Sequence, residues 1–141
     1  MKLFAVVTAV FSVVLGVQHV ALACDQKLAD KNAEKIKIAI NARDNAALEK
    51  YAVRQAGVYH ACALENSGHT KTRYLLGEAA SWDQAAQALN NESAGNLQTK
   101  QRYARQAIKI AGPIAVASSS SADEKKVAKA ILWTLSWAHA S

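Results

Sequence analysis

Apolar side chains recur at helical spacing along most of the chain. Between residues 26 and 42 they follow the spacing i, i+4, i+7 and i+11, with lysines and acids between them, at Ala29, Ala33, Ile36 and Ile40. Four later segments carry similar stripes. Because side chains three or four residues apart share one face of a helix, each stripe predicts an amphipathic helix with one buried side. The predicted helices cover residues 26–42, 45–66, a segment from Thr70 or Thr72 to 89, 97–111 and 122–138.

Polar or glycine-containing breaks separate these helices. The Ser-Gly pair at 67–68 ends the second helix, because glycine adopts the left-handed conformation after a helix without steric cost. The Gly-Pro pair at 112–113 is a stop signal for the fourth helix. Ser121 and Glu124 form a capping box that begins the fifth helix. A similar capping pattern at 81–84 divides the third helix in an alternative interpretation.

The whole pattern predicts an all-α fold of four or five amphipathic helices. No segment alternates like a strand, and the chain has only one proline. The links between helices are short, so neighbouring helices should pack as antiparallel hairpins. Asp-Asn-Ala-Ala at 44–47 returns as Asp-Gln-Ala-Ala at 83–86, which leaves a short helical-repeat array as an alternative. We favour a bundle, because the residues that flank these two segments do not repeat.

The first 23 residues have the features of a secretion signal peptide. Lys2 precedes an apolar run from 3 to 17, and small residues follow up to Ala23. The run is shorter than the ~20 residues that a membrane-spanning helix needs. We therefore expect cleavage after Ala23, a single helical domain over residues 24–141, and a periplasmic or secreted protein.

Cys24 and Cys62 are the only cysteines of the chain. In an exported protein such a pair predicts a disulfide bond. Lipid attachment to Cys24 is one alternative, although bacterial lipoprotein signals normally have Leu three residues before the cysteine and Leu22 stands two before it. Free or intermolecular thiols are the other alternative.

The chain carries a formal net charge of +6, which favours anionic partners without specifying one. The fourth predicted helix concentrates basic residues, because Arg102, Arg105 and Lys109 lie within about 60° of each other at about 100° per residue. No acidic residue interrupts 97–111. This face either binds phosphate, sulfate or carboxylate groups, for which arginine has a suitable fork geometry, or is an ordinary solvated surface.

Trp133 and Trp137 stand four residues apart on the fifth predicted helix, one turn after Lys129. Paired indoles at this spacing can bind a sugar ring, a peptide or a membrane interface. They can equally flank the apolar stripe and widen the core. The sequence leaves both interpretations open.

No set of metal ligands or cofactor-binding residues converges in the sequence. His60, Cys62 and His69 are the nearest set, but His60 and Cys62 point about 200° apart on a helix and cannot share an ion. We therefore expect no metal and no cofactor.

The stretch Glu-Ser-Ala-Gly-Asn at 92–96 is similar to the Glu-Ser-x-Gly-Asn stretch around the catalytic acid of lysozyme-like lytic transglycosylases. The resemblance implies that Glu92 is a general acid that protonates a glycosidic oxygen of peptidoglycan. In the other interpretation, the same residues form a polar loop between helices.

Together these features favour binding over catalysis. We expect a small exported helical protein that docks a partner protein or an anionic envelope polymer through the basic helix face. No specific nucleic acid partner is expected, and membrane attachment is expected only if Cys24 is lipidated. One alternative function is a peptidoglycan-cleaving glycosidase of the lytic-transglycosylase type that uses Glu92. Another is a structural or lipid-anchored envelope protein.

Overall fold

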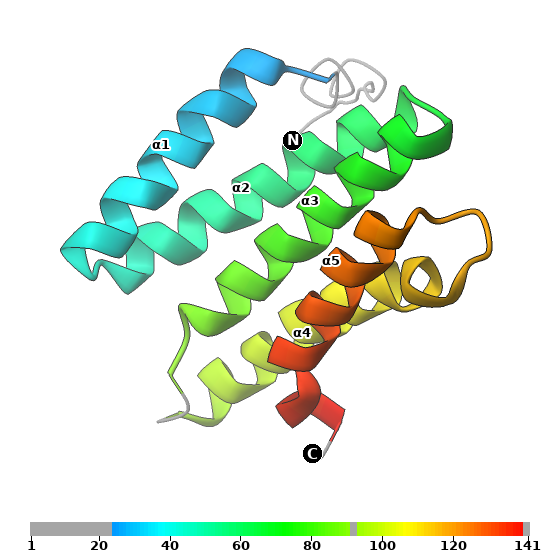
Figure 1. The fold of residues 1–141 in the computed structure, drawn as a ribbon. Helices are drawn as coiled ribbons and strands as arrows, with labels where there is room; N and C mark the ends of the chain where they lie inside the picture. The colour runs from blue at the N-terminus through cyan, green and yellow to red at the C-terminus, as the bar shows by residue number, and fades with distance from the viewer. Residues whose placement is uncertain (1–23, 91–92, 140–141) are drawn as a thin grey trace, which may run out of the picture.

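The computed structural model describes residues 24–90 and 93–139, so the predicted signal peptide and Glu92 lie outside the described residues. Over the described residues the chain forms five α-helices, one short 3₁₀ helix and no strand (Figure 1). The elements are α1 (Gln26–Ala42), α2 (Asn45–Leu64), α3 (Gly68–Gln87), α4 (Ala94–Val116), α5 (Ala122–Thr134) and η2 (Ser136–His139). The predicted all-α fold is confirmed.

Successive helices pack side by side, and together they form a bundle (Figure 1). α3 is central, because it packs against α2 and also against α4 and α5. α5 and η2 both return against α4. α1 packs mainly against α2, with a hydrogen bond of 3.4 Å from the Tyr74 hydroxyl of α3 to Gln26 Oε1, so it forms the least covered edge of the bundle.

Alanines make up most of the core. Only a few larger apolar side chains are buried with them, among which Leu76, Ile114, Ile131 and Leu135 join α3, α4 and the C-terminal segment in one cluster. The distance between two helix axes depends on the side chains at their contact. A core of alanines therefore lets these helices approach closely and leaves little room for added atoms.

Four of the five described α-helices begin at a residue whose side chain caps the helix. An oxygen of that side chain accepts a hydrogen bond from a backbone N–H of the first turn at Asp25, Asp44, Ser93 and Ser121. These caps satisfy N–H groups that have no partner inside the helix. The predicted capping box of Ser121 and Glu124 is present in full. The beginnings of α2 and α5 are accordingly those predicted from the sequence.

The predicted end of the fourth helix at 112–113 is wrong, because α4 continues through Pro113 to Val116. A proline in a helix interior removes one backbone hydrogen bond and crowds the preceding turn. The two residues that follow, Ile114 and Ala115, are buried in the core. Their burial favours continuation of the helix and outweighs the local preference of the Gly-Pro pair.

α3 and α5 also differ from the predicted helices. α3 is unbroken, because Ser81 begins no new helix and instead donates its hydroxyl hydrogen bond to the Gly77 carbonyl over 2.8 Å. α5 ends at Thr134, four residues earlier than predicted. The completely buried Leu135 occupies the turn that follows, and its burial places the chain against the core before η2 begins.

The buried side of α1 is shifted from the predicted stripe. Asn32 and Ala39 are buried in place of Ala33 and Ile40, and Ile40 is 50% exposed. Because α1 packs mainly against α2, only a narrow stripe of it is covered. Part of the apolar surface of α1 therefore faces solvent.

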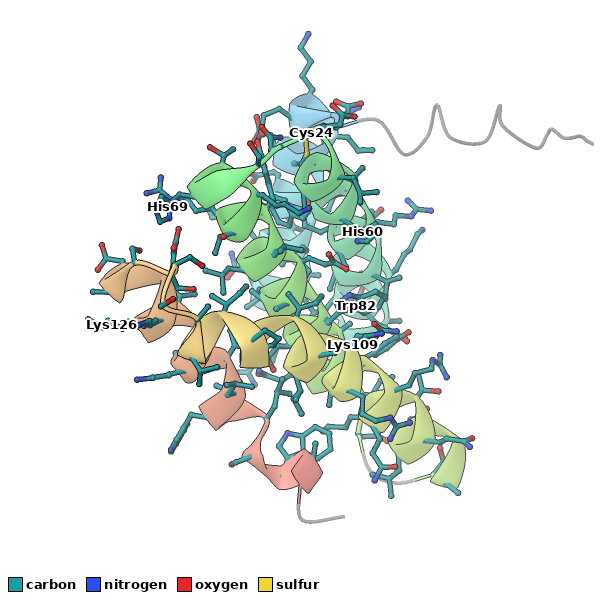
Figure 2. The ribbon with its side chains drawn as sticks, turned by 90° about the vertical axis from the view of Figure 1, so that its right-hand side faces the viewer. Cys24, His60, His69, Trp82, Lys109 and Lys126 are labelled. Carbon is teal, nitrogen blue, oxygen red and sulfur yellow. A yellow bond between two sulfur atoms is a disulfide. The ribbon has the colours of Figure 1, made fainter. Side chains whose placement is uncertain are left out.

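The predicted disulfide bond between Cys24 and Cys62 is confirmed, and it ties the start of α1 to the last turn of α2 (Figure 2). The backbone N–H of Cys24 also donates a hydrogen bond to the Glu65 carboxylate over 2.8 Å. No free cysteine is present among the described residues. No described helix is long and apolar enough to cross a membrane.

Candidate functional site

A groove of about 390 Å³ lies between α2, α3 and α4. Its aliphatic part consists of Leu75, Ile110, Pro113 and Ile114. Its polar part consists of His60, Glu78, Gln106 and Lys109. We refer to it as the central groove. Cavities of this size with an apolar lining and a few polar groups are typical of binding sites for small ligands or single side chains.

The α4 side of the central groove is one stripe of that helix. Gln106, Lys109, Ile110 and Pro113 follow the spacing i, i+3, i+4 and i+7, which places them on the same face. Because Pro113 has no N–H, the Lys109 carbonyl cannot receive the hydrogen bond that an ordinary helix would provide. Lys109 and Ile110 precede Pro113, and the continuation of α4 adds Pro113 and Ile114 to the aliphatic lining of the groove.

The opposite side carries a histidine held by a buried carboxylate. His60 Nδ1 lies 3.1 Å from Glu78 Oε1, and Trp82 Nε1 donates a hydrogen bond to Glu78 Oε2 over 3.3 Å. The Glu78 side chain is only 9% exposed, whereas that of His60 is 54% exposed. Burial of a carboxylate is costly unless its oxygens have partners, and here both have one. His60 is therefore oriented by Glu78, and its Nε2 is the nitrogen that remains to meet a ligand.

His60, Trp82 and Lys109 appear on the same face of the molecule (Figure 2). They come from α2, α3 and α4, and the groove therefore depends on the packing of three helices. The residues that line it include no serine, threonine or cysteine, so it has no hydroxyl or thiol nucleophile for His60 to activate. The arrangement can bind an aliphatic group that carries a carboxylate, because Lys109 and Gln106 are hydrogen-bond donors.

The predicted basic face is only partly associated with this groove. Arg102, Arg105 and Lys109 are all exposed on α4, but only Lys109 lines the groove. The Arg102 guanidinium lies 5.6 Å from the centre of the Tyr103 ring. The three residues therefore lie along one helix, while the groove is at the end marked by Lys109.

Tyr103 contacts Trp82, the residue whose indole donates a hydrogen bond to Glu78 of the groove. Its ring stacks on Trp82 at 5.5 Å, and its hydroxyl donates a hydrogen bond to Glu49 Oε2 over 2.8 Å. Burial, and then the hydrogen bond to Glu49, raise the pKa of Tyr103 to about 12. The hydroxyl consequently stays protonated at neutral pH and links α4 to α2 next to the indole that holds Glu78.

The two predicted tryptophans occupy different environments. Trp133 is 77% exposed at the end of α5, whereas Trp137 is half-buried in η2 and packs against the core. Lys100 Nζ lies 5.2 Å from the centre of the Trp137 ring. Because α5 ends between them, the two indoles do not stand on one helix. The core interpretation therefore applies to Trp137 and not to Trp133.

Glu92, which the resemblance to lytic transglycosylases implies as a general acid, lies outside the described residues. Two neighbours of the same stretch have structural roles at the start of α4. Ser93 caps the helix by accepting the Asn96 N–H over 3.1 Å, and the Asn96 side chain donates to Asn90 Oδ1 over 3.0 Å. No group of three or more potential metal ligands converges in the described part of the chain. Cys62, one of the ligands considered from the sequence, is taken up by the disulfide bond.

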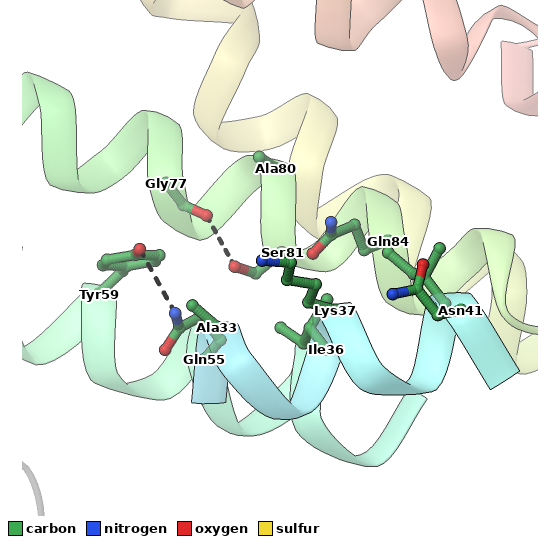
Figure 3. Close-up of a pocket in the computed structure, with 11 residues that line it drawn as sticks. Ala33, Ile36, Lys37, Asn41, Gln55, Tyr59, Gly77, Ala80, Ser81 and Gln84 are labelled. Carbon is green, nitrogen blue, oxygen red and sulfur yellow. Dashed lines mark hydrogen bonds between the residues drawn. The ribbon is translucent and has the colours of Figure 1, made fainter. Parts of the chain in front are cut away.

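A second groove of about 400 Å³ separates α1 from α3 and is shown in Figure 3. One of its polar groups joins two helices, and two further hydrogen bonds lie within α2 and within α3. Gln55 Nε2 donates to the Ala29 carbonyl over 2.9 Å and to the Tyr59 hydroxyl over 3.4 Å, while Ser81 donates to the Gly77 carbonyl. We regard the central groove as the better candidate for a functional site, because it combines an aliphatic lining with the Lys109 ammonium and an imidazole oriented by a buried carboxylate.

The pairing of His60 with Glu78 is the part of the site that sequence reasoning missed. The two residues are 18 positions apart and lie on different helices. One signal was present, since Glu78 is a charged residue within the apolar stripe that contains Leu75, Ala79 and Trp82. A carboxylate on the buried side of a helix requires a partner from another element.

Comparison with known proteins finds no family model that matches this chain, no similar curated protein and no similar solved structure. The function is therefore inferred from the geometry and chemistry of the chain's own residues.

Proposed function

We propose that this protein is a small exported binding protein, not an enzyme, and that it docks a partner polypeptide in the central groove. The partner would offer a carboxylate next to aliphatic side chains. The observation that carries this proposal is the combination, in one groove, of an aliphatic lining with the Lys109 ammonium and the oriented His60 imidazole.

The chemistry of the groove supports this choice of partner. Leu75, Ile110 and Ile114 offer apolar surface, and burying such surface is favourable by roughly 25 cal/mol per Å². Lys109 offers a charge-assisted hydrogen bond to a carboxylate. Glu78 competes weakly for Lys109, because its two oxygens are already engaged by His60 and Trp82.

Two matched peptides provide the test. Acetyl-Leu-Leu-Glu-amide and acetyl-Leu-Leu-Gln-amide have nearly the same size and shape and differ in one negative charge. In titrations followed by amide chemical shifts, we expect the acidic peptide to bind more tightly and to perturb the amides of Leu75 and Ile110. Lys109→Gln should weaken its binding about fivefold, the magnitude of an exposed ion pair.

The control variant is Lys35→Gln, which removes the same charge from the exposed side of α1. It should leave the affinity for the acidic peptide nearly unchanged. Equal affinities for the two peptides, or equal losses in the two variants, would remove the central groove as an anion-binding site.

A further inference from the structure

One face of α5 combines two lysines with an exposed indole. At about 100° per residue, Lys126, Lys129, Ala130 and Trp133 fall within an arc of about 100°, and all four are exposed. We call this set the α5 outer face. Lys126 extends outward from α5 on the side away from Lys109 (Figure 2).

The positive charge of the mature chain is concentrated in the part that contains this face. Residues 24–92 contain nine basic and nine acidic residues, whereas residues 93–141 contain seven basic and two acidic residues. The net charge of the second part is therefore +5 and that of the first part is zero. Such an asymmetry orients a protein toward an anionic surface.

The two acids of the second part do not neutralise the α5 outer face. Glu124 is buried and is engaged by His69 Nδ1 at 2.9 Å and by the backbone N–H of Ser121 at 2.7 Å. Asp123 is exposed in the first turn of α5, ten positions before Trp133. Asp123 lies one turn before Lys126, and no acidic residue of α5 lies beside Lys129, Ala130 and Trp133.

The fold does not require the indole at position 133. α5 is held by its opposite side, where Ala128 and Ile131 are buried in the core together with Leu135 of the following turn. Trp133 is 77% exposed, whereas tryptophan side chains are on average largely buried. Indoles flanked by lysines suit the headgroup region of a bilayer, where the ring is partly buried and the ammonium groups meet phosphates.

We propose that the α5 outer face docks the protein on an anionic phospholipid surface, with Lys126 and Lys129 at the phosphates and Trp133 among the headgroups. The association is peripheral and reversible, because it involves one indole and a few lysines. It is independent of the proposed peptide binding, since no residue of α5 lines the central groove.

Vesicles of phosphatidylcholine, with and without an equal part of phosphatidylglycerol, test this proposal. We expect co-sedimentation with the anionic vesicles alone, weakened by salt, and a blue shift of tryptophan emission. Lys126→Gln with Lys129→Gln should reduce the partition coefficient about 25-fold, because each lysine near such a surface contributes about fivefold. Trp133→Phe should retain most of the binding and lose the blue shift. The other two tryptophans, Trp82 on α3 and Trp137 in η2, are not part of the α5 outer face and pack against the core.

The control carries the same loss of charge on another helix. Lys31→Gln with Lys35→Gln removes two exposed lysines from α1 and should leave most of the partition coefficient intact. An equal loss in this variant would show attraction by net charge alone and overturn the proposal. Binding to a soluble polyanion such as heparin without binding to the anionic vesicles would overturn it as well, as would a blue shift that persists in Trp133→Phe.

Discussion

Gly77 lies where α3 passes very close to the Tyr59 ring of α2. A Cβ at position 77 would stand 2.9 Å from Cδ2 of Tyr59, whereas a Cβ at Gly57 would meet no atom within 4 Å. Gly77→Ala should lower the free energy of unfolding by about 1 kcal/mol, because overpacking outweighs the gain in helix propensity. Gly57→Ala should raise it by about 0.5–1 kcal/mol, since alanine restricts the unfolded chain. Urea denaturation measures both signs, and stabilisation by both variants would contradict the close approach.

Individual residues could be identified from the sequence more easily than their partners. The Cys24–Cys62 bond was predictable because the chain has no other cysteine. The pairing of His60 with Glu78 was not, because it depends on how α2 and α3 pack against each other. Glycine shows the same limit, since nothing local to Gly77 distinguishes it from Gly57 before the position of the Tyr59 ring is known.

Glu124 connects the start of α5 to the start of α3. Its carboxylate accepts the Ser121 N–H of the capping box and meets His69 Nδ1 at 2.9 Å. The hydrogen bond to Ser121, with a further effect from His69, lowers the Glu124 pKa below its ordinary value of 4.5. A lowered pKa means that the ionised form stabilises the fold above pH 4.5 and that this contribution is lost as pH falls through the folded-state value.

Glu124→Gln keeps the shape of the capping box and removes the charge. We expect the variant to be less stable than the wild type at about pH 7 and the difference to shrink toward about pH 3, as the pH falls toward the lowered folded-state pKa of Glu124. Guanidinium denaturation at the two pH values measures this difference. Asp123→Asn is the control, because Asp123 is an exposed carboxylate of the same turn. If the stability difference between the wild type and Glu124→Gln does not change with pH, the position stabilises the fold through its shape and not through its charge.

Helices could be predicted better than their ends. The bounds of α1 agree with the sequence pattern, and the starts of α2 and α5 agree because a capping side chain marks each of them. The ends of α4 and α5 were mispredicted, because burial of Ile114 and Leu135 decides them and burial is not a local property. The central groove was not predicted, because it depends on how α2, α3 and α4 pack against one another.

The five described α-helices differ in how much of their surface other helices cover. α3, α4 and α5 share the main core cluster, whereas α1 packs mainly against α2. The sequence predicts five similar amphipathic helices and does not distinguish the central helix from the peripheral one. The difference depends on which helix pairs form, and it determines which part of the molecule can open first.

The disulfide bond compensates for the exposed position of α1. It joins residues 38 positions apart and fixes the start of α1 to the end of α2. In the chain-entropy model a loop of this length contributes about 4 kcal/mol to the free energy of unfolding.

Because the cluster of α3, α4 and α5 contains no residue of α1, loss of the bond should release α1 and leave that cluster folded. We therefore expect reduction, or the Cys24→Ala with Cys62→Ala variant, to accelerate amide hydrogen exchange in α1 far more than in α3 and α4. Uniform acceleration in all helices would show instead that the bond stabilises a single cooperative unit, in which α1 is as essential as the central helix.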